Sequence, residues 1–352
     1  MECPAPPLDP AMESPAPLTR QELNRGVVAL KRPNHTTNLY YLAREYLFLA
    51  LAIGLPIAFF RWTRSLGYPL WVNLPGYLVS IFFIGAIQHR LSNLTHEAGH
   101  YALFKNRYMN ELVSDLCCIF LLGATTQNYR VSHWGHHAYV NDPEKDPDLI
   151  RLKQHQEYDF PMAKGRFCLL YVILQMLPKQ SLKYLWGRAK IAVLGINEGA
   201  FAETKPVYGS MPTTLLRIAY YSAGIALLTW QGWWIYLLLF WIVPIVTFYP
   251  LFMLLREIAH HTNVPDNSTY RNSRVFRPGW LEGFCIFPYG QAYHLPHHLF
   301  PSVPHYRLDK AHELAMRYPE YRNNTTICGG FFLSSPMDRQ MPTVLDLLSQ
   351  PA

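Results

Sequence analysis

The chain has 352 residues, of which half are hydrophobic, 14% are aromatic and only 16% are charged. Soluble globular domains carry about 25% charged residues, so this composition argues against an ordinary soluble enzyme and favours a membrane protein. The formal net charge of +7 suits anionic headgroups or an acidic protein partner, and no aromatic-and-basic module indicates a nucleic-acid partner.

Residues 1–45 are expected to form a cytosolic N-terminal tail. Residues 1–18 are rich in proline and lack a basic n-region, and no apolar h-region follows before residue 46, so no secretory signal peptide is predicted. The six cysteines show no C-x-x-C spacing, which disfavours a disulfide framework, an iron–sulfur cluster or a structural zinc site.

Four membrane spans in two hairpins are predicted. Ser65–Gln88 contains no charged residue and matches the roughly 20 apolar residues that cross a bilayer as a helix. Ile218–Leu255 is also free of charge and fits two spans, with a turn at Gln231-Gly232 beside tryptophans of the kind found at membrane interfaces. Tyr46–Phe60 is a shorter candidate span that glycine and proline interrupt.

Basic residues cluster before the first hairpin and between the two hairpins, whereas the hairpin tips carry only Arg61 and Arg64. Because cytoplasmic loops are enriched in Lys and Arg, both termini and the central segment are expected to face the cytoplasm. The predicted fold is an all-α membrane protein of about four transmembrane helices in two hairpins with a cytosolic helical cap. Residues 46–325 would form the membrane domain and residues 326–352 a C-terminal tail.

Eight of the 15 histidines fall into three tight groups, with the sequences HEAGH, HWGHH and HLPHH. On a helix, residues three or four apart lie on one face, so each group directs its imidazoles toward one place. Eight imidazoles exceed what one ion holds, which indicates two metal ions. Structural zinc sites usually include cysteine, whereas redox chemistry with O₂ calls for iron. The eight residues are His96, His100, His133, His136, His137, His294, His297 and His298.

The positions of these groups predict that they converge. HEAGH begins eight residues after the second span, and the pair His260-His261 begins five residues after the fourth. The other two groups follow the hairpins, so all four elements are expected to meet in the helical cap at the cytosolic membrane face. Histidines outside these groups are expected to be interfacial, as at His89, or solvated, as at His305 and His312.

The motif order H-x₃-H, H-x₂-H-H, H-x₂-H-H resembles that of the membrane fatty-acid desaturase superfamily. The words HEAGHYALFKN, HHAYVNDPEKDPDL and HHLFPSVPHYRL are similar to its acyl-lipid branch. The resemblance implies a fatty acyl substrate in a membrane lipid environment, two iron ions bound by the eight histidines, and O₂ as co-substrate. It also implies a separate ferredoxin-like or cytochrome b5-like electron donor, because the chain has no fused haem-binding HPGG segment.

The family also has a lone histidine ligand after the fourth span. Its pattern of an acidic residue followed by histidine assigns this role to His261 and places His260 beside it as an outer contact. Some relatives hold a bridging water one turn earlier, for which Glu257 is the candidate here. Carboxylates that orient metal-bound imidazoles are expected first at Asp142, Asp146 and Asp148, and then at Glu97 and Asp115.

Desaturation of a fatty acyl chain is the predicted reaction. The same motifs serve lipid and carotenoid hydroxylases. They also serve decarboxylases that convert free fatty acids to terminal alkenes, and such a decarboxylase is the leading alternative. Arg90, Arg130 and Arg256 lie near the histidine groups and are candidates for holding a free carboxylate. A metal transporter is disfavoured, because the charge-free spans carry no acid or histidine along a path through the bilayer.

Overall fold

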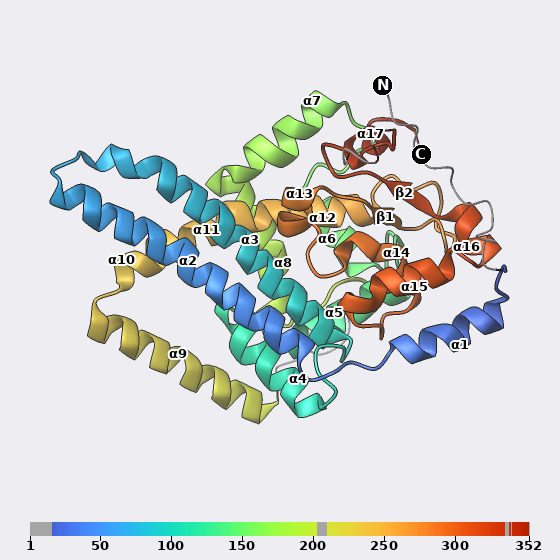
Figure 1. Ribbon diagram of the computed structural model, residues 1–352, viewed down its shortest axis with the longest axis horizontal. Coiled ribbons are helices and arrows are strands. Elements are labelled where there is room, and N and C mark those ends of the chain that lie inside the picture. The colour runs from blue at the N-terminus through green and yellow to red at the C-terminus, as the bar shows by residue number, and fades with distance from the viewer. Residues whose placement is uncertain (1–15, 203–209, 335–337, 339, 352) are drawn as a thin grey trace, which may run out of the picture.

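The computed structural model describes residues 16–202, 210–334, 338 and 340–351. Within them the chain is mostly helical with very little strand (Figure 1), which confirms the predicted all-α class. The sequence did not predict the one small sheet of this part, in which β1 (Arg274–Phe276) pairs in parallel with β2 (Thr326–Cys328). Residues 1–15 of the expected N-terminal tail lie outside the described residues.

The first hairpin consists of α2 (Thr37–Ser65) and α3 (Leu74–Gly99), joined through the 3₁₀ turn Leu70–Asn73. These helices form the long projection in Figure 1. α2 starts earlier than the predicted span and continues through Pro56 without a break. Membrane helices tolerate such a proline because neighbouring groups take up the freed carbonyl.

The second hairpin turns where the sequence predicts it. α9 (Met211–Gln231) ends at Gly232, which has the left-handed φ of 67° that closes a helix. The chain then continues through α10 (Trp234–Leu237) and α11 (Val243–Ile245) into α12 (Phe248–His261).

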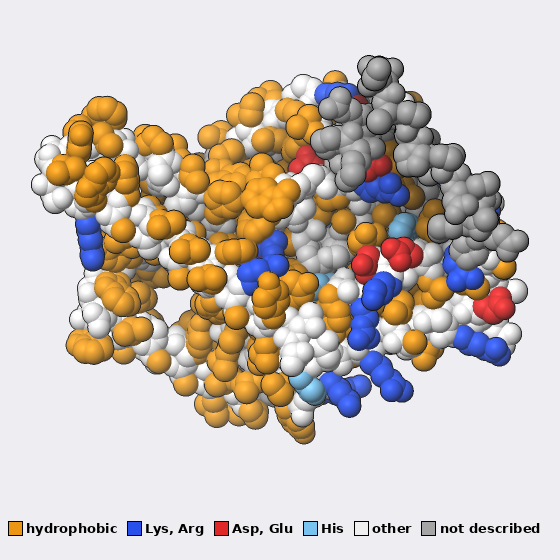
Figure 2. Space-filling view, viewed as in Figure 1, with side chains coloured by type: hydrophobic (Ala, Val, Ile, Leu, Met, Phe, Trp, Pro, Cys, Tyr) orange, Lys and Arg blue, Asp and Glu red, His pale blue; other side chains and the backbone are white. Residues whose placement is uncertain are grey.

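Three helical stretches in the described residues are long and apolar enough to cross a membrane, namely 37–65, 70–99 and 234–261. A fourth arises only if the stretches 107–122 and 126–138, which are bent by 88°, are taken as one span. α9 was expected to contain the third span but is not among them; its first half carries Arg217, Thr213 and Thr214. Hydrophobic side chains cover the end of the molecule that contains the α2–α3 hairpin and α9, and charged ones gather at the other end (Figure 2).

The charged half of the molecule is built from short helices. α1 (Arg20–Leu30) begins at a capping box of Thr19 and Glu22 and packs against α15. The others are α4 (Arg107–Ser114), α5 (Thr126–Ala138), α6 (Pro147–His155), α7 (Lys164–Phe167), α8 (Pro178–Ala192), α13 (Trp280–Cys285), α14 (His294–Leu299), α15 (Leu308–Ala315), α16 (Pro319–Asn324) and α17 (Val344–Leu348).

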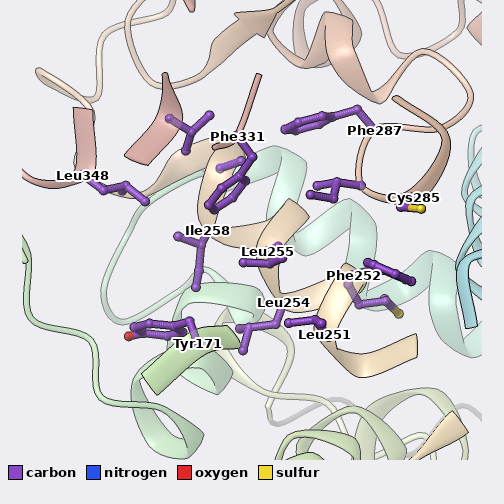
Figure 3. Packing of buried hydrophobic residues seen from close by; sticks show 14 of the residues in the cluster. Tyr171, Leu251, Phe252, Leu254, Leu255, Ile258, Cys285, Phe287, Phe331 and Leu348 are labelled. Carbon is purple, nitrogen blue, oxygen red and sulfur yellow. The ribbon is translucent and has the colours of Figure 1, made fainter. Parts of the chain in front are cut away.

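α12 lies at the centre of the main hydrophobic core. Leu254 and Ile258 on α12 are fully buried and pack among aromatic and aliphatic side chains from distant segments (Figure 3). Phe331 and Leu348 belong to the same core, so the segment 326–352, expected as a tail, contributes β2 and α17 to it. Its apolar stretches are too short for helical or strand periodicity to reveal this from sequence.

Candidate metal centre

Four helices carry the histidines of the site. α3 ends at the HEAGH motif, α5 carries HWGHH, α12 ends with His260 and His261, and α14 begins with HLPHH. α5 starts where the side chain of Thr125 accepts the N–H of Asn128, and Asp115 accepts both the N–H and the hydroxyl of Thr126. These caps fix the start of the helix that holds three of the imidazoles.

The first group contains His96, His100, His133, His137 and His297, whose ligand nitrogens all lie within 4.8 Å of one another. The Nε2 atoms of His100 and His133 are 2.8 Å apart. Those of His133 and His137, and of His137 and His297, are 3.1 Å apart. Three helices that are distant in sequence therefore direct five imidazoles at one point.

The second group contains His136, His261, His294 and His298, again with ligand nitrogens within 4.8 Å of one another. The Nε2 atom of His261 lies 3.2 Å from that of His136 and 2.8 Å from that of His294. All nine histidines expected as ligands are thus gathered in two adjacent groups. His137 of the first group stacks on His298 of the second, with ring centroids 4.1 Å apart.

The hydrogen bonds of the second group favour a cation between its imidazoles. Nδ1 of His136 lies 3.0 Å from a carboxylate oxygen of Asp146, and Nδ1 of His261 lies 2.9 Å from the main-chain oxygen of Asn272. Both Nδ1 atoms must therefore donate, which leaves each neutral ring only a lone pair on Nε2. Two lone pairs that face each other at 3.2 Å repel unless a positive charge lies between them.

Without a metal ion, Asp146 favours a proton on His136. Burial lowers the pKa of His136, but the charge and hydrogen bond of Asp146 outweigh burial and raise that pKa to about 9. A metal ion would supply the same positive charge to all members of the group at once. Metal binding would therefore displace this proton.

The distances also suit metal ligation. With metal–nitrogen bonds of about 2.0–2.1 Å, neighbouring ligand atoms lie about 2.9 Å apart at right angles and about 3.4 Å apart at tetrahedral angles. The Nε2 separations quoted above fall in or just below this range. In addition, both ring nitrogens of buried His96 lack a hydrogen-bond partner among the described residues, so at least one is free to bind an ion.

Asp146 is hydrogen-bonded to a grouped histidine. It is 1% exposed, and its two oxygens lie 3.0 and 3.1 Å from Nδ1 of His136. The same side chain caps α6, so the helix start and the imidazole fix each other. Asp148 is 4.0 Å from the same Nδ1, and Asp142 accepts the main-chain N–H groups of the next turn instead.

The two remaining outer candidates play different parts. Glu257 belongs to neither group, because its carboxylate accepts hydrogen bonds from Arg151, Arg188 and Tyr184. His260 lies flat against His294, with ring centroids 3.5 Å apart and planes 16° apart. It supports a grouped histidine by stacking.

Glu97 approaches His96, with 3.5 Å between its carboxylate and Nδ1, and it accepts the main-chain N–H of His305 at 2.8 Å. His305 is itself buried and pairs with Asn38, and His89 is fully buried against the main-chain oxygen of Cys285. The expectation that these two histidines are solvated or interfacial is wrong. The cause is tertiary packing, since spacing along the chain does not show which loops fold back onto α2 and α3.

His312, also expected to be solvated, is buried as well, and its Nδ1 lies 2.8 Å from the hydroxyl of Tyr321. Sequence reasoning missed two further supports of the site. The main-chain oxygen of Asn272 has no residue-type signal. Arg130 donates to the main-chain oxygens of Ala98 and Gly99, which ties the end of α3 to α5.

One cavity reaches the histidines, and a second cavity adjoins it. The first, about 60 Å³, is lined by members of both groups and by Arg151, Arg188, Arg256 and Glu257. The second, about 200 Å³, is mainly apolar and shares Arg256 with the first, along with three other residues. A chamber lined by histidines and charged side chains therefore shares a wall with an apolar one.

Comparison with known proteins agrees with this arrangement. The family model described as "Fatty acid desaturase" matches residues 69–328. The dihydrorhizobitoxine desaturase of Bradyrhizobium elkanii is 28% identical over 339 residues, covering 94% of this chain and 89% of that protein. The sn-1 acyl-lipid omega-3 desaturase (ferredoxin) of Nostoc sp. is 26% identical over 312 residues, covering 84% and 80%. These matches confirm the resemblance in the histidine motifs, and the chain belongs to the fatty acid desaturase family of oxidoreductases.

Proposed function

We propose that this protein is an O₂-dependent di-iron enzyme of the membrane that introduces a double bond into a fatty acyl chain. The observation that carries the proposal is the gathering of nine imidazoles into groups of five and four, in a chain of the desaturase family. Two iron ions bound to these groups would supply the activation of O₂. Two adjacent methylenes lose two hydrogens, a donor supplies two electrons, solvent supplies two protons, and O₂ leaves as two waters.

The protein's own residues hold the site in one arrangement. Asp146 and Asn272 keep the hydrogens of His136 and His261 on Nδ1, so that both Nε2 lone pairs point inward. Tyr129 stacks on His133 with ring centroids 5.2 Å apart. Such support fixes the ligand nitrogens before any ion binds, and so reduces the reorganisation needed during turnover.

The apolar cavity would position the acyl chain. Its walls include Ile119, Leu122, Tyr249 and Met253, and it meets the histidine-lined chamber at Arg256. An apolar chain lying there is shielded from water and offers a limited set of methylenes to the histidine site.

A separate electron donor of the ferredoxin or cytochrome b5 kind would complete the reaction, and the Nostoc relative is named as ferredoxin-dependent. Basic residues of α8 are candidates for docking an acidic donor. Lys179 and Lys183 are exposed there, whereas Arg188 faces Glu257 and Lys190 pairs with Glu198. The docking face therefore rests on the two exposed lysines.

Product analysis tests the reaction. Cells that express the chain would be fed deuterium-labelled fatty acids of several lengths, and their lipids and headspace would be analysed by mass spectrometry. We expect an acid that keeps its carboxyl group and lacks two hydrogens, and no such product from cells without the chain. An alkene one carbon shorter than the acid fed, without any unsaturated acid, would replace desaturation by decarboxylation. A product that gains oxygen would indicate a hydroxylase.

The sidedness of the site is proposed from the charge pattern. Reporters fused at Ala200 and at the C-terminus should both read as cytoplasmic, whereas one inserted near Tyr68 should not. Tyr68 lies in the turn between α2 and the 3₁₀ turn that precedes α3, and is 49% exposed. A reporter at Ala200 on the same side as Tyr68 would contradict the proposed orientation.

A further inference from the structure

A cluster of buried charges adjoins the histidine groups. Arg151 donates to Glu257 at 3.0 Å and to Asp148 at 3.1 Å, and Arg188 binds the other oxygen of Glu257. Two arginines are thus matched by two carboxylates. The third arginine of the chamber, Arg256, has no carboxylate of its own in this cluster.

Arg256 is 8% exposed, and its hydrogen-bonding groups are only partly used. Nη1 donates to Asn93 at 2.6 Å, and Nη2 lies 3.9 Å from Glu257, too far for a hydrogen bond. Nε is buried and has no partner in the part of the chain that the structure describes. Since a buried charged donor without an acceptor is costly, this edge of the guanidinium is suited to an anion.

The free edge has the shape that recognises a carboxylate. Nε and Nη2 lie on one side of the guanidinium, and such a pair of donors binds the two oxygens of a carboxylate in parallel. The other two arginines considered from sequence are already engaged. Arg90 donates to Glu45 at 2.7 and 2.8 Å, and Arg130 donates to two main-chain oxygens of α3.

The position of Arg256 defines how such a ligand would lie. On α12, Met253 and Tyr249 precede Arg256 and line the apolar cavity, and His260 follows it by one turn and lines the histidine chamber. Four residues of helix span about 6 Å. A carboxylate on Arg256 with its chain among Met253 and Tyr249 would thus keep its first few carbons nearest the histidines.

We propose that the substrate is a free long-chain carboxylic acid, whose carboxylate binds the Nε and Nη2 edge of Arg256 and whose oxidised carbon lies near the carboxyl end. This proposal rests on the proposed oxidation of an acyl chain. An acyl ester carries no negative charge, so it would leave the buried Nε of Arg256 without a charged acceptor. A free acid supplies both the charge and the paired acceptors.

Binding is tested on the purified, iron-loaded protein in detergent without O₂. A fatty acid, its methyl ester and the alkyl phosphate of equal length would each compete with a fluorescent fatty acid. We expect the acid to compete at least about 10-fold better than the ester, as charge-assisted hydrogen bonds require. Equal competition by acid and ester, or a clear preference for the phosphate, would overturn the proposal even if the enzyme proves to be a desaturase.

Variants assign the preference to one residue. Arg256→Gln should abolish the acid preference while iron content stays at the wild-type level, and Arg256→Lys should restore part of it. Arg277→Gln is the matched control, because Arg277 pairs with Asp338 at the surface, and it should keep the full preference. A preference that survives Arg256→Gln would contradict the assignment. The wild-type comparison stands even where a variant does not fold.

The position of attack gives a second readout. An acid deuterated at carbons 2, 3 and 4 should lose deuterium on turnover, whereas the same acid deuterated only beyond carbon 8 should retain it. Loss from the distant carbons alone would show that the chain lies in the opposite direction. Absence of any oxidised product from any acid would instead count against the proposed function.

Discussion

Replacing His136 by alanine is expected to lower the iron content from about two ions per chain to about one or fewer and to abolish turnover. His136 places its Nε2 in the group of four, and its Nδ1 is held by Asp146. Without it the group keeps three imidazoles. Loss of a residue that only supports a ligand typically lowers metal affinity or activity by about 10–100-fold. Loss of a ligand itself should therefore lower activity by at least about 100-fold.

The measurement is metal content by inductively coupled plasma mass spectrometry, together with product formation, on protein purified in detergent. His35→Ala is the matched control, since His35 is exposed and belongs to neither group. It should leave both readouts unchanged. One zinc ion per chain and no iron in the wild-type protein would refute the di-iron proposal.

The two H-x₂-H-H motifs show how much of the site can be predicted from the spacing of the histidines. In each motif, the histidines four apart share a group, His133 with His137 and His294 with His298. The remaining members, His136 and His297, belong to the other group in each case. Successive helical residues point about 100° apart, so adjacent histidines cannot face the same ion, while residues four apart nearly coincide. The sequence predicted that these imidazoles meet, but the division between two groups follows only when helix direction is considered.

Other features of the site had no sequence signal. The charges of Arg151, Arg188 and Glu257 are far apart along the chain, and they form one cluster only because α6, α8 and α12 pack together. For the same reason Arg130 and Arg256 looked equivalent from sequence. Packing gives all three nitrogens of Arg130 an acceptor, whereas Nε of Arg256, a residue that lines both cavities, has none among the described residues.

Membrane spans were predicted from composition, and this worked where the signal was strong. The charge-free stretch Ser65–Gln88 covers the connection between α2 and α3 and the first part of α3, which continues to Gly99, and the turn at Gly232 is in place. α9 is not among the stretches long and apolar enough to cross a membrane, so the predicted second hairpin has one clear span. Burial of His89 and His305 also required tertiary contacts that no local pattern encodes.

His261 and His260 are adjacent, yet their substitution should have unequal effects. His261→Ala should lower activity by at least about 100-fold. The reason is that Nε2 of His261 points into the group of four, while Asn272 holds the Nδ1 of the same ring. His260→Ala should leave a measurable remainder, with a loss of about 10-fold, because His260 acts by stacking on His294. Both variants would be assayed for iron content and product formation under the same conditions.

Phenylalanine separates ligation from packing at these two positions. Nε2 of His260 makes no hydrogen bond within the described part of the chain, and its ring is surrounded by Phe276, Phe287 and His294. His260→Phe keeps a flat ring against His294 and should recover most of the activity that His260→Ala loses. His261→Phe removes a ligand nitrogen and should recover none. Recovery by phenylalanine at position 261 but not at 260 would mean that His260 is the ligand, because only a residue acting through its ring alone can be replaced by a ring without nitrogen.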